Sequence, residues 1–134
     1  MLRIGVDLIE VERIHQAMAR YGERFFARFF TATEREQSRD IPARLAARFA
    51  AKEAAAKALG TGIGDICWVD IEVWSNKRGQ PCLRLHRAAA QLAADLGLHT
   101  WQVSLSHTHD HAIAFVVATG EFPPAGSGQQ VEDR

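Results

Sequence analysis

The feature that most constrains the fold is a long alanine-rich segment, "RLAARFAAKEAAAKALGTGIG", at residues 44–64. Alanine is the best helix former, and a glycine commonly ends a helix in the left-handed conformation. The segment therefore predicts a helix over residues 43–59 that ends at Gly60. From residue 48 on, directly before three glycines in five positions, it also carries four charged residues, which are Arg48, Lys52, Glu53 and Lys57.

Shorter elements are predicted before this helix. "RIGVDLI" alternates in the manner of a strand, with Ile4, Val6 and Leu8 on an apolar side and Asp7 on the opposite side. The period then changes to that of a helix, which Gly22 is expected to interrupt. "RFFARFF" predicts a short core-facing helix, and "TATERE" contains a capping box that starts the next one.

The second half of the chain predicts strands with one helix between them. "WVDIEVW" and "PCLRL" are expected to pair around a turn, and "TWQVSLSHTHDHAIAFVVAT" forms a hairpin around "HTHD". "RAAAQLAADLG" is the intervening helix. We expect an α+β fold, an α/β class in the broad sense, in which a small antiparallel or mixed sheet packs against the long helix and shorter helices. Residues 1–119 form this domain, and residues 120–134 form a flexible tail.

Charge and hydropathy limit the partners. Sixteen basic and sixteen acidic side chains cancel, which indicates neither a nucleic-acid-binding nor a membrane-binding protein. Acidic residues interrupt the first segment where a signal peptide would be apolar, so we expect a cytoplasmic protein. Residues 1–60 nevertheless hold 11 basic against 8 acidic side chains, so a basic surface is expected there. The arginines spaced by seven and four positions are Arg13, Arg20 and Arg24.

The charged helix suggests a phosphate site with a divalent cation. Magnesium takes oxygen ligands and typically uses one or two carboxylates plus substrate phosphates. Asp7 and Glu53 form such a pair if the helix packs across the first strand. Arg48, Lys52 and Lys57 would then neutralise phosphate oxygens nearby.

The order of three motifs resembles one enzyme family. "IGVDxxEVxRI", "RFAAKEAxxKAxGTGI" and "SLSHT" together resemble the 4′-phosphopantetheinyl transferases, specifically the small holo-acyl-carrier-protein synthase type. The resemblance covers residues 2–119. It implies transfer of the 4′-phosphopantetheine arm of coenzyme A to a serine of an apo acyl carrier protein, with release of adenosine 3′,5′-bisphosphate.

The resemblance also implies roles for individual residues. Asp7 and Glu53 would hold Mg²⁺ or Mn²⁺, and Lys57 would stabilise charge on the transferred phosphoryl group. Either carboxylate or a metal-bound water would accept the serine proton. The residues implied in coenzyme A binding are Arg48, Lys57, Gly60, Thr61, Gly62, Gly79, Pro81 and His107. The basic surface of Arg13, Arg20 and Arg24 would bind the acidic carrier protein, and the protein would be a homotrimer with active sites at subunit interfaces.

Two other functions would fit the same charged residues. A Mg²⁺-dependent nucleotide phosphohydrolase, or a non-catalytic module that binds coenzyme A or an acidic partner, would use the same charged residues. His109 and His111 are expected to be solvated rather than to hold a second metal ion. The residues do not distinguish a fatty-acid from a polyketide carrier protein, or coenzyme A from its acyl derivatives.

Overall fold

The computed structural model describes residues 1–61 and 64–121 and has the expected α+β fold. The helical half of the chain and the strand-rich half follow one another as the sequence predicts. In chain order the elements are β1 (Leu2–Glu10), α1 (Val11–Tyr21), α2 (Glu23–Phe29), α3 (Ala32–Ser38), α4 (Pro42–Leu59), the short 3₁₀ helix η1 (Trp68–Asp70), β2 (Ile71–Ser75), β3 (Pro81–Leu85), α5 (Arg87–Asp95), β4 (Leu98–His107) and β5 (His111–Gly120).

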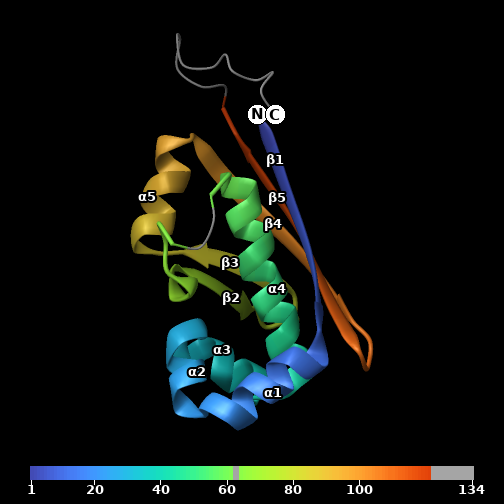
Figure 1. The fold of residues 1–134 in the computed structure, drawn as a ribbon. Helices are drawn as coiled ribbons and strands as arrows, with labels where there is room; N and C mark the ends of the chain where they lie inside the picture. Colours follow the sequence, from blue (N-terminus) through green and yellow to red (C-terminus); the bar gives the residue numbers. More distant parts are fainter. Residues whose placement is uncertain (62–63, 122–134) are drawn as a thin grey trace.

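Two antiparallel sheets flank the long helix. One has three strands in the order β1-β5-β4, and the other consists of the β2-β3 hairpin. Helix α4 packs along β1 and β5, with α1, α2 and α3 gathered near its N-terminal end (Figure 1). The core lies between α4 and the three-stranded sheet and extends to α1, α2, β2 and α5.

Helix α4 approaches β1 at backbone distance. A Cβ atom added to Gly5 would lie 1.8 Å from the carbonyl oxygen of Ala54, so only glycine fits there. The α4 alanines that face the core are almost fully buried. Small side chains on both elements therefore bring the first strand and the long helix into direct contact.

The side of β1 that carries Gly5, Asp7 and Ile9 packs on the helix, and the more apolar side faces away from it. Gly5 and Ile9 are buried against α4, whereas Ile4, Val6 and Leu8 are exposed, with Leu8 62% accessible. The predicted alternation of the two sides is confirmed. In the register of the sheet, exposed Ile113 and Phe115 of β5 lie beside Leu8 and Val6 and extend the apolar face.

Several local predictions are refined by the structure. Trp68–Asp70 form η1, so the strand predicted from Trp68 begins only at Ile71. Gly22, with φ 57°, separates α1 from α2. Thr31 and Glu34 form the capping box of α3, in which each side chain accepts a hydrogen bond from the other residue's backbone N–H.

The predicted domain ends at residue 119, and the last residue that the structure describes is 121. β5 continues to Gly120, and residues 122–134 of the predicted tail lie outside the described residues. Within the described parts of the chain, no helix is long and apolar enough to span a membrane.

Candidate active site

Asp7, Glu53 and Lys57 meet where α4 crosses β1. The Lys57 Nζ atom lies 3.3 Å from an Asp7 carboxylate oxygen and donates a hydrogen bond to the Val6 carbonyl oxygen at 2.8 Å. Glu53 lies one helical turn before Lys57, so it projects from a neighbouring position on α4. The contact between Gly5 and Ala54 sets the distance between the two elements that carry these groups.

The pKa of Glu53 is shifted by its surroundings in this site. Burial of Glu53 raises its pKa, the negative charge of Asp7 raises it further, and Lys57 lowers it. A carboxylate whose charge is disfavoured by a neighbouring carboxylate gains from a bound cation, so Glu53 beside Asp7 is suited to hold one. Their oxygen ligands match the preference of Mg²⁺, which needs no more than two protein carboxylates.

Lys52 does not belong to this site, which corrects the prediction that it neutralises phosphate. Its side chain is 0% exposed, and Nζ lies 2.9 Å from a Glu34 carboxylate oxygen. The same atom donates to the carbonyl oxygens of Trp68 and Ile71. The other Glu34 oxygen accepts a hydrogen bond from the Val73 N–H at 2.7 Å. All three ammonium hydrogens are therefore used to join α4 to α3, η1 and β2.

Arg48 is also mostly buried. Its Nη1 donates to the Arg44 carbonyl oxygen at 3.1 Å, whereas its buried Nε has no hydrogen-bond partner among the described residues. Burial lowers the pKa of Arg48, an effect that the charge of Glu34 opposes. A buried N–H without an acceptor is costly, so this group is suited to receive an anionic oxygen.

The glycine loop predicted in coenzyme A binding follows α4 directly. Gly60 has φ 78°, and its N–H bonds to the Lys57 carbonyl oxygen at 3.0 Å, which ends the helix. The Thr61 hydroxyl donates to an Asp65 carboxylate oxygen at 3.2 Å. Gly62 lies outside the described residues. The loop begins one turn beyond Lys57.

The remaining predicted coenzyme A residues belong to other strands. Gly79 lies in the turn before β3, which Pro81 begins, and the turn is closed by a 2.8 Å bond from the Gly79 N–H to the Asn76 carbonyl. His107 ends β4, and β5 separates it from β1. Among residues 1–61 and 64–121, no hydrogen bond or ion pair joins these three to Asp7, Glu53 or Lys57.

The three arginines predicted to bind a carrier protein are all exposed, on two helices. Arg13 and Arg20 lie on α1, whereas Arg24 lies on α2 beyond the break at Gly22. The Arg20 guanidinium packs over the Tyr21 ring at 5.4 Å from its centre. Arg24 therefore does not continue the α1 face.

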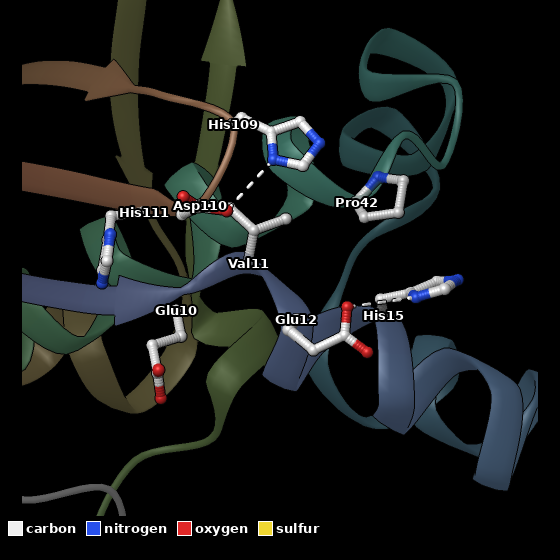
Figure 2. A pocket seen from close by; sticks show the side chains of 8 residues that line it. All are labelled: Glu10, Val11, Glu12, His15, Pro42, His109, Asp110 and His111. Carbon is white, nitrogen blue, oxygen red and sulfur yellow. Dashed lines mark hydrogen bonds and ion pairs between the residues drawn. The ribbon is translucent and has the colours of Figure 1, made fainter.

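His109 and His111 line a surface hollow where the β4-β5 turn meets the start of α1. The Val11 N–H donates to the Asp110 carbonyl oxygen at 2.8 Å and holds the two segments together. Figure 2 shows the imidazoles of His15, His109 and His111 well apart, with His109 beside Asp110 at 3.0 Å. The described part of the chain contains no group of three or more metal-binding side chains. Solvation of His109 and His111 stays a prediction.

Comparisons with known proteins assign this chain to a family. A sequence model of the 4′-phosphopantetheinyl transferase superfamily matches residues 3–116. A protein of Herpetosiphon aurantiacus named holo-[acyl-carrier-protein] synthase is 54% identical, and the match covers 90% of this chain and all of the relative. A Desulforudis audaxviator protein of the same name is 46% identical, with 90% and 94% covered.

Solved structures agree with the sequence relatives. The Helicobacter pylori holo-[acyl-carrier-protein] synthase in complex with coenzyme A has a TM-score of 0.80 and 30% identity, covering 87% of this chain and 99% of that one. The synthase of Neisseria meningitidis has a TM-score of 0.79 and 33% identity, covering 87% and 97%. The sequence-based prediction of family and fold is thus confirmed: the chain belongs to the 4′-phosphopantetheinyl transferase superfamily and, within it, to the holo-[acyl-carrier-protein] synthase type.

Proposed function

We propose that this protein transfers 4′-phosphopantetheine from coenzyme A to a serine of an apo acyl carrier protein. The observation that carries the proposal is the meeting of Asp7, Glu53 and Lys57 across β1 and α4, within a chain whose relatives are named for this reaction. The serine oxygen forms a bond to the phosphorus that bears pantetheine. The bond from that phosphorus to the oxygen of the adenosine-side phosphate breaks, and adenosine 3′,5′-bisphosphate leaves.

The chain's own residues position this reaction and neutralise its charge. Such transfers depend mainly on alignment and on stabilisation of negative oxygen. Lys57, 54% exposed and anchored by the Val6 carbonyl, has an ammonium group directed at the site. Arg48 offers an unpaired N–H to a phosphate oxygen. A carboxylate oxygen of Glu53 or Asp7, or water, accepts the serine proton, and burial makes Glu53 more basic than an ordinary glutamate.

Asp7 and Glu53 are the proposed ligands of Mg²⁺ or Mn²⁺. When bound, the ion would neutralise pyrophosphate charge and orient the phosphate oxygens. Support comes from the two oxygen donors and from the pKa of Glu53, which burial and then the negative charge of Asp7 raise.

We propose a homotrimer in which neighbouring subunits complete each active site. The exposed apolar face of β1 and β5 supports this arrangement, because isolated soluble domains rarely leave such a continuous surface uncovered. His107, Gly79 and Pro81 do not reach Asp7 within one chain, so a neighbour is the proposed source of these contacts to coenzyme A, with Gly60–Gly62 on the nucleotide side. Carrier protein and coenzyme A meet in the cytoplasm, which is the proposed compartment.

The exposed Arg13, Arg20 and Arg24 are proposed to bind the acidic carrier protein. We expect Arg13→Glu to weaken carrier-protein binding and to leave coenzyme A affinity nearly unchanged, because Arg13 lies on α1 and contacts neither carboxylate. Calorimetric titration with each partner separately measures this difference. Equal loss for both partners would contradict the assignment.

The decisive experiment is the intact mass of a purified apo acyl carrier protein after incubation with this protein, coenzyme A and Mg²⁺. We expect the carrier to gain the mass of phosphopantetheine. The gain should disappear with EDTA and with Glu53→Ala. Release of inorganic phosphate without carrier modification would instead favour a nucleotide phosphohydrolase. Coenzyme A binding that survives Asp7→Ala and Glu53→Ala, without transfer, would favour a binding module.

A further inference from the structure

Helix α3 supplies hydrogen-bond acceptors along one edge of β2, as a neighbouring strand would (Figure 1). Backbone N–H groups two residues apart on a strand point to the same edge. The Val73 N–H donates to a Glu34 carboxylate oxygen at 2.7 Å, and the Ser75 N–H donates to the Gln37 side-chain oxygen at 2.7 Å. Glu34 and Gln37 are three residues apart, so they lie on one face of α3. This face therefore holds β2 up to its last residue.

Gln37 makes a second hydrogen bond at the end of β2. Its Nε2 donates to the Ser75 carbonyl oxygen at 3.0 Å, so one side-chain amide binds both polar groups of the Ser75 backbone. Pro81 lies opposite Ser75 in the hairpin and has no N–H that could reach this carbonyl. Gln37 thus supplies from α3 a bond that β3 cannot make.

Residues 76–80 form the β2-β3 turn, and the Asn76 side chain organises it. The Asn76 Oδ1 atom accepts hydrogen bonds from the N–H groups of Arg78 and Gln80 at 2.9 and 3.0 Å. Its Nδ2 donates to the Gln80 side-chain oxygen at 3.0 Å, and the Gly79 N–H bonds to the Asn76 carbonyl oxygen. Because Asn76 directly follows Ser75, a shift of Ser75 would displace the whole turn.

The β2-β3 turn presents positive charge and open backbone to solvent. Lys77 and Arg78 are exposed, and within residues 1–61 and 64–121 neither side chain takes part in an ion pair. A Cβ atom added to Gly79 would meet nothing within 4 Å, so a ligand can approach the backbone there. Unpaired cations beside accessible backbone are suited to phosphate oxygens.

We infer that Gln37 is a positioning residue for coenzyme A, because by holding Ser75 it sets where the turn with Gly79 and Pro81 meets the ligand. This inference rests on the proposed function, which makes the turn a coenzyme A contact. Gln37 acts through Ser75 and not by contact with the transferred group. Its loss should therefore change the affinity for coenzyme A and not the rate of transfer at saturation.

Kinetics with both substrates test the inference. Gln37→Met keeps the length of the side chain but removes the amide, and Asn76→Ala removes the central acceptor of the turn. For both variants we expect KM for coenzyme A, and Kd for adenosine 3′,5′-bisphosphate by calorimetry, to rise roughly tenfold. The kcat value and KM for the carrier protein should stay within about twofold. Asn76→Asp keeps the acceptor of the two N–H groups and should recover part of the affinity.

Gln91→Met is the matched control, because the Gln91 amide also donates a hydrogen bond, but to Asp95 within α5. The control should keep the KM values of the unmodified protein. An unchanged KM for coenzyme A in both Gln37→Met and Asn76→Ala would overturn the inference. Equal rises for both substrates, or the same rise in the control, would show a general structural role and would also overturn it.

Two further outcomes are separable. If circular dichroism shows that Gln37→Met does not fold, the Asn76 variants, which alter only the turn, decide the question. Failure of the unmodified protein to modify any carrier protein would contradict the proposed function. Normal transfer by the unmodified protein, together with variants of unchanged coenzyme A affinity, would contradict the role of Gln37 alone.

Discussion

Helix α4 carries two lysine–carboxylate pairs that differ mainly in burial. The Lys52–Glu34 pair is 0% exposed on both sides, and the ammonium group also bonds to two backbone carbonyls. In the Lys57–Asp7 pair the lysine is 54% exposed and the aspartate 20%. The first pair has no capacity left for a ligand, whereas the second can exchange its contact for a phosphate oxygen. Burial therefore decides which lysine holds the fold and which can take part in chemistry.

The largest expected effect comes from breaking the buried pair. Lys52→Met leaves the Glu34 carboxylate buried without its cation, so we expect the free energy of unfolding to fall by about 3–5 kcal/mol. Urea denaturation followed by circular dichroism measures the loss. The double variant Lys52→Met/Glu34→Gln removes both charges and should recover part of the stability. A single variant as stable as the original would show that the pair does not hold the fold.

Breaking the exposed pair should have the opposite balance of effects. For Lys57→Met we expect kcat for carrier modification to fall by about 100-fold to 1000-fold, because a charge that stabilises the transferred phosphoryl group is lost. The free energy of unfolding should change by less than about 1 kcal/mol, as for other exposed ion pairs. Lys57→Arg keeps the charge and should retain more activity than Lys57→Met. A stability loss as large as that of Lys52→Met would remove the distinction between the two pairs.

The smallest expected effect concerns the pH dependence that Glu53 adds. Its folded pKa is raised, first by burial and then by Asp7, so the folded state binds this proton more tightly than the unfolded state does. Stability from this group is therefore present below the unfolded pKa and is lost as the pH rises through the folded pKa. Without metal at neutral pH, Glu53→Gln should melt roughly 1–4 °C higher by calorimetry. At a pH below both the folded and the unfolded pKa of Glu53, the variant should melt at the same temperature as the original protein. A higher melting temperature that persists there would show that the charge of Glu53 is not its cause.

Sequence patterns predicted the helix and the carboxylate pair but did not separate the two lysines. Alanine content and Gly60 were sufficient to locate α4, because they act locally. Lys52 and Lys57 are the same residue type, five positions apart, which places them about 140° from each other around the helix. Which of the two lysines faces the interior depends on the packing of η1 and β2 against α4. These elements lie further along the chain, so the helix pattern does not include them. Glu34, the partner of Lys52, was predicted only as a helix cap.

The positions of Phe29, Phe49 and Trp68 and the packing of β1 depend on contacts that the sequence pattern alone does not define. Phe29 and Phe49 fit a core pattern, and the strand assigned to Trp68 hid its position on a 3₁₀ turn against α4. For β1, alternation defines two sides but does not say which one meets the helix. The side with Gly5 does so, because the Ala54 carbonyl fills the position that a side chain at residue 5 would occupy.

The contact between Gly5 and Ala54 has a consequence for engineering and for sequence change. Moving the acidic pair and its lysine into another scaffold would fail if the accepting strand had any side chain at the crossing point, since the two backbones could not approach as closely. The charged residues must therefore be moved together with the strand and the helix that cross, including the glycine at the crossing point. No substitution of Gly5 is conservative, because even the Cβ atom of alanine would collide with the Ala54 carbonyl oxygen.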